Sequence, residues 1–264
     1  MGVLGAFFDD SGTHASSPVV ALGGLLGTEE QWDEFATAWT ALLAQPLPGK
    51  QPLTQFHLSP CRAGDGEFRG YSLAERDRVT YLFRRVILDI GFVTIAAAVN
   101  RTAWNEIVVG DLADHLGQPE GPCFYKCMQL LMNTIRFRKP GEKVFIFLDQ
   151  GTKAQFEAWA TLYRLQADEY PEISGISFAP VPEVIALQGA DMIATETYQY
   201  AQQWLKDGES AAANAHFREY LKRDLTAGFI FDREHIQEMA LRVRESLDGA
   251  AQRSGVTQTR SIQE

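Results

Sequence analysis

The sequence lacks any long apolar run. Its longest uncharged apolar stretches, near residues 18–27 and 91–99, are too short to cross the hydrocarbon core of a bilayer. The N-terminus also lacks the basic start and the cleavage site that are typical of a secretory signal peptide. We therefore expect a cytoplasmic protein that does not bind or span a membrane.

Cysteine is scarce, with only Cys61, Cys123 and Cys127 in 264 residues. An odd number of cysteines in a long chain argues against a disulfide framework. Cys123 and Cys127 lie four residues apart and would share a helix face, but two thiols without a nearby histidine are at most half of a zinc site. We interpret both as small apolar residues that pack a helix.

Positive charge is in deficit, and the net charge of −10 argues against a broad electrostatic footprint on DNA or RNA. Three local clusters of lysine and arginine remain, at residues 84–85, 136–143 and 222–223. Each is best interpreted as a solvated helix face. A local contact with nucleic acid is still compatible with this charge, and a bound cation would offset part of it.

Two common catalytic motifs are missing. No glycine-rich phosphate loop of the Walker or dinucleotide type is present, since Gly23-Gly24 lies inside an apolar run without a following lysine. There is also no Gly-x-Ser-x-Gly motif, so a serine hydrolase is not expected.

The apolar patterns alternate between strands and helices. Strands are predicted at residues 3–9, 18–26, 92–99, 144–148 and 173–180, and helices at 28–43, 72–90, 102–118, 124–137, 153–167, 183–205, 210–224 and 233–247. The first two strands and the polar loop between them predict an antiparallel pair. Residues 46–70 are rich in proline and glycine and predict a loop. Ser72 and Glu75 have the spacing of a capping box.

This order of elements predicts an α/β fold, a mixed sheet flanked by helices with extra C-terminal helices. No linker or internal repeat interrupts residues 1–248, which we therefore expect to form a single domain. Residues 249–264 are polar and without periodicity, and they predict a flexible tail.

Three carboxylates stand at the ends of apolar runs or inside an apolar helix. Asp9-Asp10 ends the first strand, Asp149 ends the strand at 144–148, and Asp191 lies within the helix at 183–205. A charge beside a core is unfavourable unless a partner compensates it. A shared divalent metal, Mg²⁺ or Mn²⁺, is the simplest partner for oxygen ligands.

Asp9 and Asp149 would lie close together if their strands are neighbours, because ligands of open α/β sheets bind at such strand ends. Each would then raise the pKa of the other. Gln188 and Thr195 share a helix face with Asp191. Simpler interpretations stay open: polar turns after Asp9 and Asp149, and an ion pair of Asp191 with a lysine or arginine.

His57 is the only histidine in the loop at 46–70. A histidine beside a carboxylate site can carry protons or bind a metal, and a loop histidine can also simply hydrogen-bond the backbone. His14, which follows the first acidic turn, is a weaker candidate for the same roles.

Four short segments of the chain resemble the signature segments of the DUF3800 family. They are Phe8-Asp9-Asp10-Ser11-Gly12, Phe56-His57, Phe145-Ile146-Phe147-Leu148-Asp149 and Leu187-Gln188-Gly189-Ala190-Asp191. The resemblance implies a ribonuclease H-like fold and a two-metal nuclease-type site at Asp9, Asp149 and Asp191, with Asp10 as an auxiliary ligand. The family usually has Glu where this chain has Asp10, and often an acid where it has Gln55.

Two functions follow as expectations. The first is a divalent-metal-dependent nuclease or phosphodiesterase that acts on a nucleic acid or nucleotide, in which Asp9, Asp149 and Asp191 bind metal and His57 moves a proton. The second is a catalytically inactive ribonuclease H-like protein that acts as a binding module in a phage-defence or mobile-element setting. Gln55 and the acidic charge favour the second.

Overall fold

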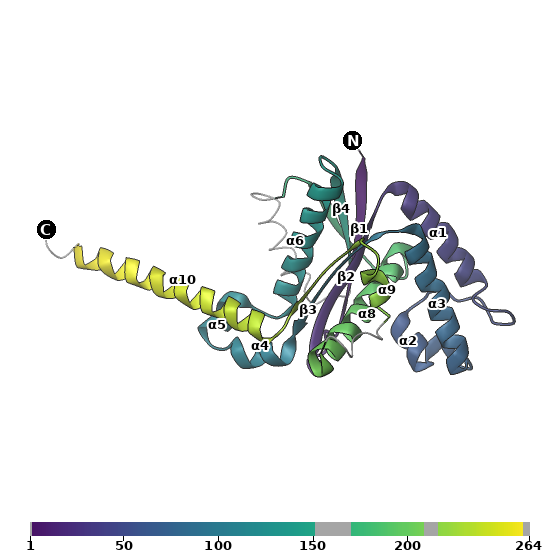
Figure 1. Ribbon diagram of the computed structural model, residues 1–264, viewed down its shortest axis with the longest axis horizontal. Helices are drawn as coiled ribbons and strands as arrows, with labels where there is room; N and C mark the ends of the chain where they lie inside the picture. Colours follow the sequence, from purple (N-terminus) through teal and green to yellow (C-terminus); the bar gives the residue numbers. More distant parts are fainter. Residues whose placement is uncertain (1, 151–169, 209–215, 261–264) are drawn as a thin grey trace.

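A six-stranded mixed sheet forms the centre of the protein. The computed structural model describes residues 2–150, 170–208 and 216–260 (Figure 1). The strands are β1 (Val3–Ser11), β2 (Val19–Gly27), β3 (Val93–Asn100), β4 (Lys143–Asp149), β5 (Ile173–Ala179) and β6 (Thr226–Phe231), in the spatial order β5-β4-β1-β2-β3-β6. Antiparallel pairs join β1 to β2 and β2 to β3, and parallel pairs join β1 to β4, β4 to β5 and β3 to β6.

Helices cover both faces of this sheet. They are α1 (Glu29–Ala44), α2 (Leu58–Ala63), α3 (Leu73–Ile90), α4 (Arg101–Ile107), α5 (Asp111–Leu116), α6 (Glu120–Arg138), α8 (Ile185–Asp207), α9 (Arg218–Leu221) and α10 (Arg233–Arg260). One apolar core joins α1, α2, α3 and α8 to one face, which we call the α8 face. A second core joins α4, α5, α6 and the start of α10 to the opposite face, the α6 face. The predicted mixed sheet flanked by helices is confirmed.

Local sequence signals explain where the first helices begin and end. Thr28 and Ser72 each accept a hydrogen bond from the backbone three residues later, and each closes a capping box, at α1 and α3. Gly91 ends α3 in the left-handed conformation. The antiparallel pairing of β1 and β2 is also as predicted. Cys123 and Cys127 are buried in α6, which confirms their role in helix packing.

Strand alternation distributes the side chains of β1 between the two faces. Ala6 and Phe8 belong to the core of the α6 face. Phe7 points to the α8 face, where its ring meets that of Trp32 in α1 with centroids 4.5 Å apart. Asp9 continues the series of Phe7 on the α8 face, and Asp10 continues that of Phe8 on the α6 face.

Helix α8 lies unusually close to the sheet because β2 carries a glycine beneath it. A Cβ atom at Gly23 would lie only 2.6 Å from the backbone nitrogen of Ala194. Gly23 is paired in register with Asp9 on β1. The missing side chain therefore lets the α8 backbone approach the sheet directly beside Asp9.

Two predicted regions differ from the structure, and a third cannot be compared with it. The composition of residues 46–70 predicts a loop, but this segment contains α2 and a short 3₁₀ helix, Gly66–Phe68. The helix predicted at 210–224 is represented within the described residues by the four-residue α9, and the unpredicted strand β6 follows it at the sheet edge. The helix predicted at 153–167 lies outside the described residues.

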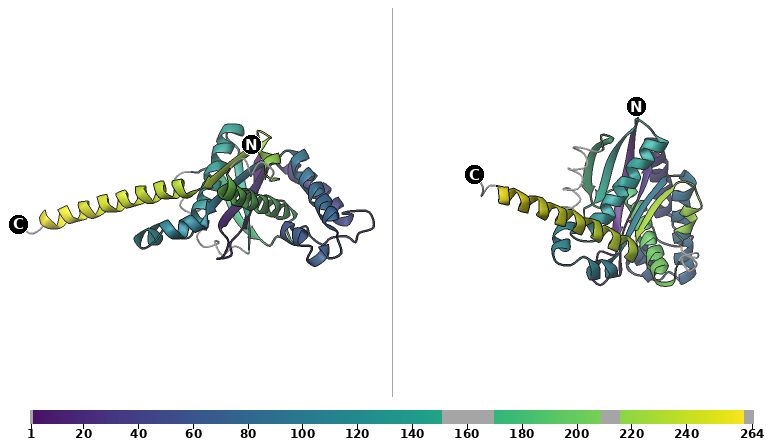
Figure 2. Two further views of the ribbon diagram at one scale, coloured as in Figure 1. Left: turned by 60° about the horizontal axis from the view of Figure 1, so that its bottom comes forward. Right: turned by 60° about the vertical axis from the view of Figure 1, so that its left-hand side comes forward.

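The C-terminal helix is longer than predicted. Helix α10 continues to Arg260, so residues 249–260 are helical rather than irregular. Figure 2 shows this helix extending away from the sheet. No helix within the described residues is both long enough and apolar enough to span a membrane.

Candidate active site

Asp9 and Asp149 lie at the same edge of the sheet and on the same face. Strands β1 and β4 are parallel, and Phe8 is paired with Leu148, so Asp9 and Asp149 come next on neighbouring strands. The rings of Phe7 and Phe147 stack on the α8 face with centroids 4.5 Å apart. Because side chains alternate along a strand, Asp9 and Asp149 face the same side as these rings.

Asp191 reaches this group from α8. Its side chain is almost completely buried, with 3% of the residue exposed, and Asp9 is 7% exposed. The close packing of α8 over Gly23 places the helix next to β1, where Asp9 lies. The structure therefore brings together Asp9, Asp149 and Asp191, the three carboxylates that the sequence selects.

The electrostatics of Asp9 reflect this crowding. Burial raises the pKa of the Asp9 carboxyl well above its usual range, and the negative charge of Asp191 is the next cause. The charges of Asp10 and Asp149 raise this pKa further, while the backbone N–H of Asp10, which donates to Oδ1 of Asp9 at 2.7 Å, opposes them. No lysine or arginine in the described part of the chain forms an ion pair with Asp9.

His57 is held by Asp191. Its Nδ1 atom lies 2.9 Å from Oδ1 of Asp191, and the backbone N–H of Leu58 donates to Oδ2 at 3.1 Å. This hydrogen bond raises the pKa of His57 against the effect of burial, and the charges of Asp191 and Asp149 raise it as well. The His57 side chain is 45% exposed, so it can still exchange protons with solvent.

Gln188 fixes the segment that carries His57. Its Oε1 atom accepts hydrogen bonds from the indole N–H of Trp39 at 3.0 Å and from the backbone N–H of Phe56 at 2.9 Å. Gln188 and Asp191 lie three residues apart on α8 and bind consecutive parts of residues 56–58. Helical spacing predicts that Gln188 and Asp191 share a face of the helix. No residue near Gln188 in the sequence indicates which backbone group its side chain binds.

Asp10 lies on the other face of the sheet. Burial and the charges of Asp149 and Glu120 raise the pKa of Asp10 to about 6. Its Oδ2 atom is buried without a hydrogen-bond partner among the described residues. Nη2 of Arg101 donates to Oε1 of Glu120 at 2.7 Å and to the backbone carbonyl oxygen of Gly12 at 3.0 Å. Asp10 therefore interacts electrostatically with the site but does not share the face of Asp9 and Asp191.

The donor chemistry suits a hard divalent cation, although the arrangement is not that of a closed metal site. Carboxylate oxygens are the ligands that Mg²⁺ and Mn²⁺ prefer, and no lysine or arginine among the residues that the structure describes compensates the charge of Asp9. Among the described residues, however, no three His, Cys, Asp or Glu side chains are grouped so as to hold an ion. Both oxygens of Asp191 are already hydrogen-bonded to residues 57–58.

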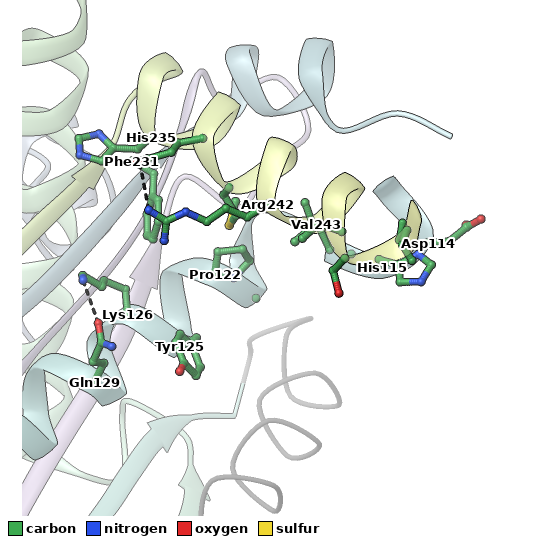
Figure 3. Close-up of a pocket in the computed structure, with 17 residues that line it drawn as sticks. Asp114, His115, Pro122, Tyr125, Lys126, Gln129, Phe231, His235, Arg242 and Val243 are labelled. Atoms are coloured by element: carbon green, nitrogen blue, oxygen red, sulfur yellow. Dashed lines mark hydrogen bonds and ion pairs between the residues drawn. The ribbon is translucent and has the colours of Figure 1, made fainter. Parts of the chain in front are cut away.

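A large cavity of about 900 Å³ lies elsewhere, on the α6 face. Figure 3 shows that α6 contributes Tyr125 and Lys126 to it, and α10 contributes His235 and Arg242. None of the clustered aspartates lines it. This cavity is therefore separate from the carboxylate site.

Comparisons with known proteins give structural neighbours only. No protein-family model matches the sequence, and no curated protein matches it. A crystal structure of Bst-RNase HIII in complex with Mn²⁺ is similar with a TM-score of 0.43 and 11% identity, over 92% of this chain and 70% of that chain. A mutant protein of Bst-RNase HIII is similar with a TM-score of 0.41 and 10% identity, over 84% of this chain and 65% of that chain.

Proposed function

We propose that this protein is a divalent-metal-dependent phosphodiester hydrolase, a nuclease or phosphodiesterase, whose site is formed by Asp9, Asp149 and Asp191. The observation that carries the proposal is the buried carboxylate of Asp9, whose pKa is raised by burial and by the charges of neighbouring acids. Such an arrangement is unfavourable by itself and becomes favourable when a cation binds. The resemblance to the DUF3800 family points in the same direction.

The residues that would hold Mg²⁺ or Mn²⁺ are Asp9 and Asp149, with Asp191 nearest to a second ion. Asp10 would act from the other face through its charge. When bound, such ions lower the pKa of water and neutralise charge on a phosphodiester. The substrate would be a nucleic acid or a nucleotide in the cytoplasm, gripped locally because the chain is acidic overall.

His57 would supply the proton. Asp191 orients the imidazole through Nδ1, which leaves Nε2 as the nitrogen that exchanges protons. Because the pKa of His57 is raised, the ring holds its proton to higher pH than a free histidine does. A protonated His57 can donate to a leaving oxygen and regain the proton from solvent through its exposed side.

Cleavage assays test the proposal directly. Labelled RNA, DNA and RNA–DNA hybrid are incubated with the protein in Mn²⁺ or Mg²⁺, and the Asp149→Asn variant is measured in parallel. Asp89→Asn serves as a matched control, because Asp89 is exposed on α3 and pairs with Arg85. We expect cleavage by the wild type and the control, and its loss in Asp149→Asn. Absence of cleavage of every substrate, or equal cleavage by Asp149→Asn, would refute the proposal.

A binding module without activity is the second candidate. The observation that favours it is the double hydrogen bonding of Asp191 to residues 57–58, together with Gln55 at a position where relatives of the DUF3800 family often have an acid. Calorimetric titration with Mn²⁺ separates the two functions. Binding that disappears in Asp9→Asn favours the hydrolase, whereas no binding by the wild type favours the module.

A further inference from the structure

Helix α2 is attached to α8 at both of its ends. At its start, His57 and the backbone N–H of Leu58 bind the carboxylate of Asp191. At its other end, Nη2 of Arg62 lies 3.6 Å from Oε1 of Glu196. Five residues separate the attachment points on each of the two helices. Helix α2 therefore runs along α8 in the same direction, with one acidic side chain of α8 at each end.

Glu196 does not need Arg62 as its counter-ion. Glu196 is 1% exposed, and Arg84 of α3 already donates to its Oε1 atom from Nε at 3.1 Å and Nη2 at 2.6 Å. Buried carboxylates require such a partner, and Arg84 provides it. Arg62 adds a second guanidinium beside one carboxylate, and its side chain is 29% exposed. What this second contact adds is a tether between α2 and α8.

The two attachments of α2 would respond differently to a cation. An ion held near Asp191 draws on the same carboxylate oxygens that bind His57 and Leu58, so it competes with the attachment at the start of α2. The contact between Arg62 and Glu196 involves neither Asp9 nor Asp191. It would therefore remain when the first attachment loosens.

We propose that Arg62 and Glu196 are a positioning pair, which keeps α2 and His57 docked beside the carboxylates when Asp191 turns to a cation. The positioning role depends on the proposed metal-dependent function, but the tether between α2 and α8 can itself be tested without metal. Arg62 is the better residue to change, because Glu196 also neutralises the buried Arg84 and its loss would disturb the fold.

Hydrogen exchange of the amides in residues 58–63, read by mass spectrometry, reports whether α2 stays docked. Without metal, Arg62→Met should leave exchange almost unchanged while Asp191 still holds the start of the helix. In an Asp191→Ala background the same substitution should accelerate exchange on the order of tenfold, because neither of the two attachments then holds α2 to α8. Arg62→Lys should restore protection, because it keeps the charge.

The matched control is Arg69→Met, the same substitution at an exposed arginine that follows the 3₁₀ helix. Circular dichroism of each variant checks that the fold is kept. If Arg62→Met has no effect in the Asp191→Ala background, or if Arg69→Met has an equal effect there, the positioning pair is refuted.

Added Mg²⁺ tests the purpose of the tether. With saturating Mg²⁺, the wild type should keep the amides of residues 58–63 protected, and Arg62→Met alone should now lose that protection. Equal protection in both proteins, while calorimetry shows that Mg²⁺ binds, refutes the positioning role. Absence of Mg²⁺ binding in calorimetry instead refutes the proposed function, and the metal-free comparison then still decides whether the tether exists.

Discussion

Replacement of Gly23 by alanine should separate α8 from the sheet. The added Cβ would lie 2.6 Å from the nitrogen of Ala194 and 2.8 Å from its Cα, whereas an ordinary contact begins at 3.4 Å. The obstructing atoms belong to the helix backbone, so no side chain can rotate away. Helix α8 must therefore move outward by about 0.8 Å.

The magnitude follows from two opposing effects. Overpacking of this kind costs about 1–3 kcal/mol, while alanine in place of glycine stabilises by about 0.4–1 kcal/mol through the unfolded chain. We expect a net loss of roughly 1–2 kcal/mol, which lowers Tm by roughly 2–8 °C for a protein of this size. The shift also moves Asp191 away from Asp9, so Mn²⁺ affinity should fall.

Gly228→Ala is the matched control for this prediction. Gly228 is also a strand glycine, but its added Cβ would meet only the carbonyl oxygen of Ala96, at an ordinary 3.7 Å. Thermal unfolding and calorimetric titration with Mn²⁺ are measured for both variants. Equal stability of the two, or recovery of Gly23→Ala by Ala194→Gly, which removes only a side chain, would contradict the steric argument.

Four further predictions concern the charges and hydrogen bonds of the site. Asp9→Asn should stabilise the metal-free protein at pH 7. A carboxyl group whose pKa is raised in the folded state lowers the free energy of unfolding as pH rises above the pKa that it has in the unfolded chain. Urea unfolding measures this free energy, and a variant less stable than the wild type would contradict the prediction. Addition of Mg²⁺ at 100 times its Kd should stabilise the wild type by about 2.7 kcal/mol and Asp9→Asn much less, as seen by the shift in Tm. His57, unlike Asp9, is charged when it is protonated. Because its pKa is raised in the folded state, the His57–Asp191 pair stabilises the protein fully below the ordinary histidine pKa of 6.5, and this stabilisation is lost as pH rises through the folded pKa. Unfolding of wild type and His57→Ala across pH 5 to 9 should therefore converge at the alkaline end, and a constant difference would argue against the pair. Gln188→Leu leaves two buried N–H donors without an acceptor and should cost about 1–3 kcal/mol for each, measured by urea unfolding, with Gln129→Leu on α6 as the control.

Much of the site could be predicted because it depends on strand periodicity. Asp9 and Asp149 end two apolar runs, and parallel pairing of β1 with β4 is enough to bring them to one edge. The same periodicity separates neighbours: Asp9 and Asp10 must point to opposite faces of one strand. Strand alternation is therefore sufficient to place Asp10 on the face opposite to Asp9.

Helix α2 could not be predicted, because what stabilises its start is distant in the chain. The backbone N–H of Leu58 has its partner in Asp191, 133 residues later, so no local capping residue marks the helix. Strand β6 escapes prediction for a similar reason. It is a short edge strand, and the strand with which its backbone pairs, β3, is distant in the sequence.

The sequence by itself determined the order of the first five strands and of the long helices, the capped ends of α1 and α3, and the acids that end two of the strands. These features depend on side-chain periodicity and on contacts within a few residues. Tertiary structure alone decided how close α8 comes over Gly23, which backbone groups Gln188 and Asp191 bind, and that Arg62 meets Glu196. Those contacts join residues more than a hundred positions apart, and only the packing of α8 on the sheet brings them within reach.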